Sequence, residues 1–441
     1  MEKAATASDV VIIGAGLAGL AAAAAAARAG AGVIILDGRS PGGRARTDAQ
    51  DGFRFNRGPH ALFRAGAGPR VLARLGVRPA THIPPLLGSR VLADGRRYSP
   101  LSRRVLGARA AAQVIAVLAR VAAAAPDSFA HRSTQEWIAA FELVPRAAAV
   151  LAALVRVTSY ASDLDRMSAD LAIRQIRLAF RGVVYPDDGW QVLVTGLLAS
   201  ATDAGAEHRA HTAATELTGE PGAWRVRTLS GDEIAAAAVV VAAGTPAAAR
   251  RLLPVDPGWG DLGAEVTAAC LDLGVRHTRA RFVLGIDEPV YLSPHAPPGR
   301  LAPEGHGMVH VMRYGSRAAD ADRAQLQALA EAAGISAADV AVQRFLPRMV
   351  VATSLPAPGA GLAGRPPVPV PGAPGVFVAG DWVGPEGWLS DCSLASGELA
   401  GTRAARAARA PGASASGAAR ARGAQVGLKH RKPYGFACIR G

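Results

Sequence analysis

The stretch Val10–Asp37, VVIIGAGLAGLAAAAAAARAGAGVIILD, decides the fold. Its apolar run over Val10–Ile13 predicts a buried strand, the alanine-rich run over Leu20–Ala29 predicts a helix, and Val33–Leu36 predicts a second buried strand. Strands without polar alternation are typical of parallel sheets that are covered on both faces. A strand, a helix and a second strand in this order form a βαβ unit, so the sequence predicts an α/β fold.

The turn between the first strand and the helix carries the glycine pattern of a phosphate site. Gly14-Ala15-Gly16-Leu17-Ala18-Gly19 matches G-x-G-x-x-G, in which the three glycines permit a tight turn, backbone approach to a pyrophosphate and close helix–strand packing, in that order. The helix N-terminus then faces the phosphates, and Asp37 accepts hydrogen bonds from a ribose. The pattern predicts a dinucleotide site. We interpret Arg39 as a surface charge, because Asp37 would repel the 2′-phosphate of an NADP-like ligand.

A second stretch near the other end, Val376–Gly397 (VFVAGDWVGPEGWLSDCSLASG), has the same character. Its first four residues, Val376–Ala379, predict a short buried strand that stops at Gly380-Asp381, and a helix of small residues opens near Ser390–Ser393. A strand, a glycine turn and a helix N-terminus receive an anion or the polar edge of a ligand. The chain thus holds two such arrangements far apart in the sequence.

The segment after the first motif indicates which dinucleotide is bound. In RSPGGRARTDAQDGFRFNRGPHALF, Gly42-Gly43-Arg44 follows the acid closely, and Gly58-Pro59-His60 comes later. With the glycine motif before it, this order resembles the flavin-containing amine oxidase and phytoene (carotenoid) desaturase superfamily, whose members bind FAD. The C-terminal motif and VYLSPHAPPGRLAPEG (Val290–Gly305) look most like the bacterial phytoene-desaturase-like branch. One departure is Asp37, where the family usually has Glu.

The resemblance makes the two motifs halves of one FAD site. It implies that Arg44 contacts the diphosphate or ribityl region, that Gly58 and Pro59 pass beside the isoalloxazine, and that Asp381 lies near the ribityl chain. The helix after Asp381 would aim its N-terminus at the flavin's pyrimidine oxygen. The residues assigned to the cofactor are Gly14, Gly16, Leu17, Ala18, Gly19, Asp37, Gly38, Gly43, Arg44, Gly58, Pro59, Gly380, Asp381, Leu394 and Ala395.

The same resemblance predicts the domain organisation. We expect a discontinuous Rossmann-like FAD-binding domain, a parallel sheet with helices, from residues 8–97, 182–255 and 349–410. An α+β substrate domain would comprise 98–181, mostly helical, and 256–348. Ser133-Thr134-Gln135-Glu136 predicts a capping box in the first insert, and RVRTLSGDEI predicts a hairpin. Gly182–Ala210 resembles the family's Y-P-x-G-G stretch, with Asp188 where a glycine is usual.

The chemistry expected of such a chain is hydride removal from a C–H bond, with the cofactor doing the redox work. The candidate catalytic residues are His60, Trp190 and Trp388, with Trp382 also near the predicted flavin. His60 follows the Gly-Pro beside the ring and could handle a proton, whereas a structural histidine bonded to the backbone is the alternative. The tryptophans could wall an apolar tunnel or simply pack in the core. Cys392 is expected to be a buried, inert thiol.

The substrate class is inferred from what is missing. Amine oxidases of this family commonly hold a lysine beside the flavin, and no lysine occurs between Lys3 and Lys429. Arginine is a poor substitute because its charge is permanent and its shape differs. We therefore expect an FAD-dependent oxidoreductase that forms C=C in a lipophilic, isoprenoid- or carotenoid-like substrate, with an unknown electron acceptor. The alternatives are an amine oxidase that forms an imine and releases peroxide, a flavin-dependent isomerase, and a non-catalytic FAD-binding partner.

Charge and composition exclude some other classes of function. The formal charge is +14, but nine basic and no acidic residues follow Thr402, and the rest of the chain carries only +5, so we expect no nucleic-acid partner. Residues 411–441 are predicted to be a disordered basic tail. Three scattered cysteines predict neither disulfides nor a metal site, and we expect a cytoplasmic protein. Peripheral membrane contact through the apolar stretch Val105–Ala125 stays open.

Overall fold

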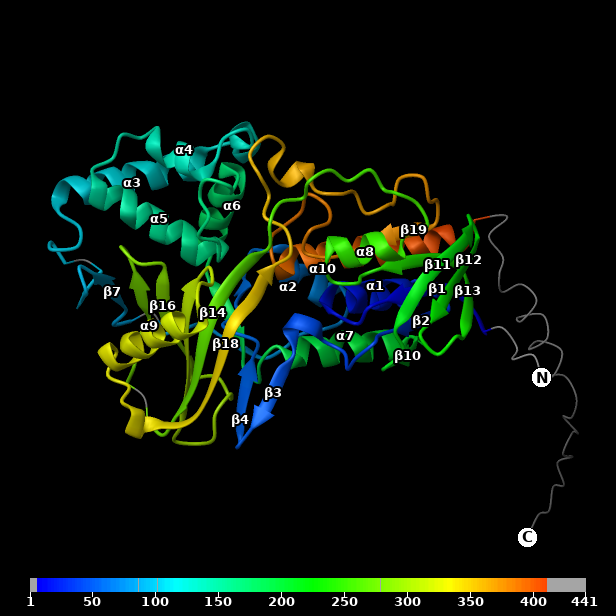
Figure 1. Ribbon diagram of the computed structural model, residues 1–441, viewed down its shortest axis with the longest axis horizontal. Coiled ribbons are helices and arrows are strands. Elements are labelled where there is room, and N and C mark those ends of the chain that lie inside the picture. Colours follow the sequence, from blue (N-terminus) through cyan, green and yellow to red (C-terminus); the bar gives the residue numbers. More distant parts are fainter. Residues whose placement is uncertain (1–5, 86, 101, 278, 411–441) are drawn as a thin grey trace, which may run out of the picture.

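The computed structural model describes residues 6–85, 87–100, 102–277 and 279–410. Two parts lie side by side along the long axis of the molecule (Figure 1). One holds a sheet that is covered by α1, α7 and α10, and the other holds a second sheet beside the bundle α3–α6. The predicted tail, 411–441, lies outside the described residues.

The first sheet confirms the predicted α/β class. Its strands run in the order β10-β2-β1-β13-β12-β11, with β19 paired to β13 off this path. The pairs β10–β2, β2–β1, β1–β13 and β13–β19 are parallel, and the hairpin strands β11 and β12 are antiparallel to their neighbours. The strands are β1 (Thr6–Ile13), β2 (Val33–Leu36), β10 (Glu207–Arg209), β11 (Ala214–Glu220), β12 (Ala223–Thr228), β13 (Glu233–Val241) and β19 (Val376–Val378).

β13 joins the two ends of the chain. Val239–Val241 pairs with β1 on one side and with β19 on the other, whereas Glu233–Ala236 pairs with β12. The segment that follows residue 375 therefore returns to the sheet that the N-terminal segment begins. The predicted hairpin over RVRTLSGDEI is present as β12 and β13.

Small residues allow the helices on this sheet to approach closely. α1 (Leu17–Arg28) is buried along its whole length from Leu17 to Ala27, because it packs against the sheet, α7 (Gln191–Asp203) and α10 (Ser390–Ala407). A Cβ atom at Gly397 of α10 would lie 2.2 Å from the carbonyl oxygen of Ala18, and one at Gly401 would lie 2.0 Å from that of Ala22. The alanine and glycine content of these helices thus reflects their packing.

The second sheet has the strand order β18-β14-β17-β16-β15-β7-β8. Alternate residues of its central strands face opposite sides: Ala269, Leu271 and Leu273 pack with α9, whereas Ala268 and Cys270 pack with α3 and α5. The strands are β7 (Arg90–Ala93), β8 (Arg96–Tyr98), β14 (Val266–Val275), β15 (Val283–Gly285), β16 (Val290–Ala296), β17 (Gly307–Tyr314) and β18 (Val340–Ala352).

Two domain boundaries differ from the prediction: residues 349–352, predicted for the FAD-binding part, continue β18 of the second sheet. Residues 90–97 are predicted to belong to the FAD-binding part, but β7 pairs in parallel with β15 and so belongs to the second sheet. This pairing joins segments far apart in the sequence, and local patterns carry no signal for it. The predicted capping box at Ser133 is present at the start of α4.

The remaining elements connect the two parts. The small sheets are β3 (Thr47–Gln50) with β4 (Phe53–Asn56), and β5 (Leu62–Phe63) with β9 (Val183–Pro186) and β6 (Thr81–His82). The other helices are α2 (Ala67–Arg74), α3 (Ala108–Ala123), α4 (Thr134–Ala139), α5 (Pro145–Ser159), α6 (Ala169–Phe180), α8 (Pro246–Leu252) and α9 (Ala319–Ala332), with short 3₁₀ turns at Gly43–Ala45, Pro126–Phe129, Ala337–Asp339 and Gly361–Gly364. Within the described residues, no helix has the length and apolar character required to cross a bilayer.

Candidate functional site

A cavity of about 1020 Å³ lies where the first sheet meets β18 and the start of α10. Both predicted motifs contribute to its wall, together with the segments between them. The predicted site residues that line it are Gly14, Gly16, Leu17, Ala18, Asp37, Gly38, Gly43, Arg44, Pro59, His60, Trp190, Gly380 and Asp381. Two stretches separated by more than 300 positions therefore form one site.

The three glycines of the first motif have different surroundings. A Cβ atom at Gly14, where φ is +105°, would lie 2.4 Å from the carbonyl oxygen of Ala242, and one at Gly19 would lie 1.8 Å from that of Gly14. A Cβ atom at Gly16 would meet no atom within 4 Å. Gly16 is the N-cap residue of α1, and no side chain caps the helix there. Gly14 and Gly19 thus serve packing, whereas Gly16 leaves the helix N-terminus open to the cavity.

Asp37 is oriented by the backbone around it. Its carboxylate accepts hydrogen bonds from the backbone N–H of Ala15, at 2.6 Å, and of Arg39, at 2.7 Å. The side chain is half-buried beside the glycine turn, at the end of β2. Arg39 is exposed and also lines the cavity, which places its charge at the rim of the site.

Arg44 and Asp381 connect the two motifs. The Arg44 guanidinium donates two hydrogen bonds to the Asp381 carboxylate, at 2.7 and 2.9 Å, and a third to the carbonyl oxygen of Val351. Thr353 adds hydrogen bonds from its backbone N–H and its hydroxyl. Burial raises the pKa of Asp381, but the charge and hydrogen bonds of Arg44, with those of Thr353, bring it below its ordinary value. Asp381 is therefore an ionised carboxylate in the cavity wall.

His60 and Trp190 stand together on the wall. Their ring centroids are 4.7 Å apart. The Nδ1 atom of His60 lies 2.8 Å from the carbonyl oxygen of Gly58, so Nδ1 carries the hydrogen and Nε2 is left as an acceptor. Burial lowers the pKa of His60 to about 4, and His310 and Arg44 act in the same direction. His60 is thus neutral at neutral pH, and the Nε1 atom of Trp190 is buried without a hydrogen-bond partner among the described residues.

The helix α10 begins where the sequence predicts, at Ser390, but it meets the cavity through other residues than the predicted Leu394 and Ala395. Leu389, the N-cap residue, has φ of 55° and lines the cavity with Ser390 and Ser393. Leu394 is fully buried in the core of the first sheet, and neither it nor Ala395 is part of the cavity wall. The helix faces its N-terminal turn to the cavity, so the side chains one position later point elsewhere.

Several predicted residues have packing roles in the structure. Trp388 does not line the cavity; it is buried beside α5 and α6, and its Nε1 donates to the carbonyl oxygen of Ser159. Trp382 packs against Trp259. Gly58, with φ of +87°, leaves room for Met349, which would lie 2.3 Å from a Cβ atom there. Burial raises the pKa of the Cys392 thiol to about 11, which agrees with the expected inert thiol.

The apolar part of the cavity wall contains residues that the sequence did not single out. They are Tyr160, Leu346, Met349, Val351 and Leu389. Tyr160 ends α5 with φ of 61°, and Leu389 also has positive φ. Positive φ is uncommon for such side chains and often marks functional sites, but it has no sequence signature at these positions.

Positive charge dominates the polar part of the wall. Six arginines line the cavity (Arg39, Arg44, Arg46, Arg57, Arg251 and Arg348) against three carboxylates (Asp37, Glu265 and Asp381). Glu265 is already paired with Arg348 at 2.7 Å. The cavity therefore suits an anionic ligand and offers little to a cationic one.

Comparison with known proteins agrees with this architecture. Residues 12–75 match the family model of the NAD(P)-binding Rossmann-like domain. A search of curated protein sequences gives no match. Similar solved structures include a wild-type putrescine oxidase bound to putrescine, with 16% sequence identity, a TM-score of 0.69 and coverage of 90% of this chain and 98% of that chain.

Two further structures extend the likeness. Cyclohexylamine oxidase from Brevibacterium oxydans is 17% identical, with a TM-score of 0.67 over 91% of this chain and 98% of that chain. A fatty acid isomerase from P. acnes, which produces CLA, is 18% identical, with a TM-score of 0.67 over 89% and 97%. At these identities the likeness shows a shared fold, and the predicted phytoene-desaturase-like branch stays a prediction.

Proposed function

We propose that this protein binds FAD in the 1020 Å³ cavity and is an oxidoreductase that removes a hydride from a lipophilic substrate to form C=C. The observation that carries the proposal is the mixed lining of the cavity, which combines groups for an anion with apolar side chains. The uncapped N-terminus of α1 and an excess of arginine lie in the wall, together with apolar side chains and Tyr160. Such a site can hold both a long anionic cofactor and an apolar molecule.

The residues present fit FAD. Gly16 leaves open space where a pyrophosphate would approach, and Asp37 stands at the end of β2 where a ribose would lie. Arg44 and Asp381 are set to hold the middle of the cofactor, and the turn at Leu389 and Ser390 would face the flavin. When bound, FAD supplies the hydride-accepting chemistry, and the protein supplies orientation and electrostatics.

The charge of the wall supports an apolar substrate over an amine. Carboxylates or aromatic faces can hold an ammonium substrate. The three carboxylates of the wall are engaged with Arg348, with Arg44 or with backbone amides, which leaves the rings of Trp190 and Tyr160. Leu389, Met349 and Leu346 offer dispersion contacts instead. Putrescine oxidase and cyclohexylamine oxidase nevertheless keep amine oxidation as the first alternative, since their fold is shared.

A flavin-dependent isomerase is the second alternative. The fatty acid isomerase with the same fold supports this alternative, and the excess of arginine in the cavity wall also suits a lipid that bears a carboxylate. An isomerase needs reduced cofactor and leaves no net reduction of it. The two functions therefore differ in whether substrate bleaches the bound flavin.

Anaerobic bleaching of the bound flavin's yellow absorbance tests these functions. The purified protein is loaded with FAD and mixed with isoprenoid polyenes, unsaturated fatty acids and amines in separate syringes. Bleaching by polyenes alone supports the proposal, bleaching by amines alone replaces it with amine oxidation, and conversion of a fatty acid only after prior reduction replaces it with isomerisation. Failure of the protein to bind added FAD would contradict all three functions.

A further inference from the structure

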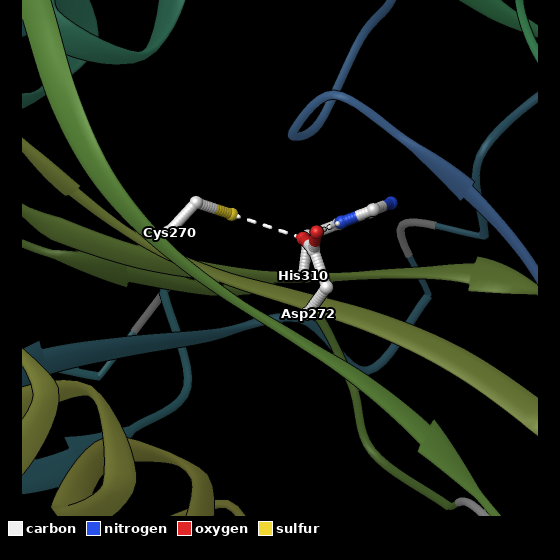
Figure 2. Close-up of side chains that lie close together, drawn as sticks. All are labelled: Cys270, Asp272 and His310. Carbon is white, nitrogen blue, oxygen red and sulfur yellow. Dashed lines mark hydrogen bonds and ion pairs between the residues drawn. The ribbon is translucent and has the colours of Figure 1, made fainter. Parts of the chain in front are cut away.

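A row of polar side chains crosses the second sheet next to the cavity. Asp272 on β14 is the direct cross-strand partner of His310 on β17 and of Arg344 on β18. Figure 2 shows the Asp272 carboxylate between Cys270 and His310. Its Oδ1 lies 2.6 Å from Nδ1 of His310 and 3.1 Å from the Cys270 thiol, and Oδ2 accepts two hydrogen bonds from Arg344, at 2.7 and 3.0 Å.

This row lies on the face of the sheet that borders the cavity. Asp272 lies two residues from Cys270 on the same strand, and Cys270 is the cross-strand partner of Leu346, which lines the cavity. Cys270 packs in the same core cluster as Tyr160, Met349 and Val351 of the cavity wall. The Asp272–His310 pair is therefore one step along β14 from the residues that face the proposed substrate.

The surroundings of the Asp272–His310 pair suit a buried ion pair and do not suit a metal ion. Asp272 and His310 are fully buried, and four hydrogen bonds occupy both oxygens of the carboxylate. Cys270, Asp272 and His310 have metal-like spacing, but the Arg344 guanidinium already neutralises the carboxylate and opposes a cation. Burial raises the pKa of Asp272, and the charges and hydrogen bonds of His310 and Arg344 lower it below its ordinary value.

The second nitrogen of His310 is the unusual feature. Because an ionised carboxylate only accepts, Nδ1 of His310 carries the hydrogen and Nε2 is left as a proton acceptor. Nε2 is buried and has no partner among the described residues, and the same holds for Nε2 of His295 and His82. Buried imidazole nitrogens nearly always have a partner, so three orphans in one region point to a polar path and not to ordinary packing.

These rings form a continuous series from the interior to the surface. The centroids of His310 and His295 are 4.5 Å apart, His295 stacks on Tyr185 at 4.0 Å, and Tyr185 contacts His82 at 5.6 Å. His82 lies 2.8 Å from Asp187, whose side chain is partly exposed. Burial lowers the pKa of His295 well below its ordinary value, and His310, His60 and His82 act in the same direction.

The geometry points to a proton relay: His310, which Asp272 orients one step along β14 from the cavity wall, takes up the proton released in the reaction, and His295, Tyr185 and His82 lead it to solvent at Asp187. The inference rests on the proposed function and accounts for the second hydrogen that the reaction removes. Forming C=C breaks two C–H bonds. One hydrogen leaves with its electron pair as hydride to bound FAD, and the other leaves as a proton through the relay, so no further oxidant is needed.

The first experiment needs no substrate. In FAD-loaded protein labelled with ¹⁵N-histidine, reduction of the flavin by dithionite adds negative charge to the cavity. We expect the His310 signals to change from one protonated nitrogen to two in wild type. The change should be absent in Asp272→Asn, which retains the shape of the carboxylate but not its charge. His277 is exposed, and the variant His277→Gln identifies its signal by removing it. In wild type this signal should stay constant on reduction and serves as the control. No protonation change at His310 or His295 would overturn the relay whatever the substrate is.

The second experiment uses whichever compound bleaches the flavin. His310→Gln retains a donor for Asp272 but takes up no proton, so it should slow bleaching roughly 100-fold, the range of general acid–base effects. Added imidazole should restore part of the rate. His277→Gln is the matched control, because it makes the same substitution at an exposed histidine outside the series. Equal FAD content and unchanged bleaching in His310→Gln would contradict the relay and leave the proposed function intact.

Discussion

Arg44 and Asp381 are 337 positions apart in the sequence and are joined by two hydrogen bonds, at 2.7 and 2.9 Å, on the wall of one cavity. Arg44 belongs to the 3₁₀ turn Gly43–Ala45 after the first glycine motif, and Asp381 follows β19. The Asp381 side chain is 2% exposed, whereas that of Arg44 is 39% exposed toward the cavity. The pair thus fastens the two halves of the site and leaves Arg44 accessible to a ligand.

Replacing Arg44 should weaken both the fold and the cofactor site. Arg44→Ala leaves the buried Asp381 carboxylate with Thr353 alone, so we expect the free energy of unfolding to fall by about 2–4 kcal/mol. Arg44→Lys keeps the charge but loses the two-pronged contact, so its effect should be smaller. Urea unfolding of the cofactor-free protein measures both. Arg46→Lys, in a half-exposed pair with Asp48, is the control and should change stability by less than ~1 kcal/mol.

The glycines of the first motif should separate cofactor binding from folding. Gly16→Ala adds a methyl group into open space beside the α1 N-terminus, so the protein should fold with wild-type stability and lose FAD affinity. Gly19→Ala forces a Cβ atom to 1.8 Å from a carbonyl oxygen and should lower stability by roughly 1–3 kcal/mol or more. Thermal unfolding and flavin titration distinguish the two. A Gly16→Ala protein that binds FAD normally would contradict the proposed place of the pyrophosphate.

The contact between α1 and α10 should tolerate no added methyl group. A Cβ atom at Gly401 would lie 2.0 Å from the carbonyl oxygen of Ala22, so Gly401→Ala should separate the two helices and lower stability by about 1–3 kcal/mol. Gly260→Ala is the matched control, because a Cβ atom there has no neighbour within 4 Å. Equal melting temperatures of the two variants would show that the helices approach less closely than described.

Asp391 should make stability depend on pH. Burial raises its pKa to about 6, against hydrogen bonds from the backbone N–H groups of Gly68 and Ala67 at the start of α2. The folded state therefore binds a proton more tightly than the unfolded state between about pH 4 and 6. Over this window the contribution of Asp391 to the free energy of unfolding falls as pH rises, by up to about 3 kcal/mol.

The variant Asp391→Asn isolates that contribution. It keeps an acceptor for Gly68 and carries no charge at any pH, so its stability relative to wild type should increase from pH 4 to 6 and then level off. Urea unfolding of both proteins at a series of pH values gives the difference directly. A difference that stays constant from pH 4 to 7 would show that Asp391 has an ordinary affinity for protons in the folded state.

Much of the first sheet could be predicted because its signals are local. The glycine pattern at Gly14, the apolar run before it and Asp37 after it each identify one element, and the C-terminal Gly380-Asp381 repeats the logic. The apolar part of the cavity wall could not be predicted, because Tyr160 and Leu389 come from helix ends that only the tertiary fold brings there.

The sequence contains one weak indication of the polar row that crosses the second sheet. Asp272 is a lone acid in VTAACLDLGV, and a charge within an apolar strand needs a partner. The identity of that partner depends on the pairing of β14 with β17 and β18, and register is set by long-range contacts. Trp388 shows the converse: its place in a loop beside the motif suggested a role at the flavin, but its indole is used to hold α5.

The pairing of β19 with β13 has a consequence for how the protein is made. A ribosome releases the N-terminal segment first, whereas β19 and α10, which complete the cavity, emerge more than 300 residues later. Contacts of such wide separation form late and slowly. The nascent chain therefore has no complete cavity until Ser393 of α10 has emerged, so under the proposed function a bound cofactor would mark a chain whose first sheet is complete.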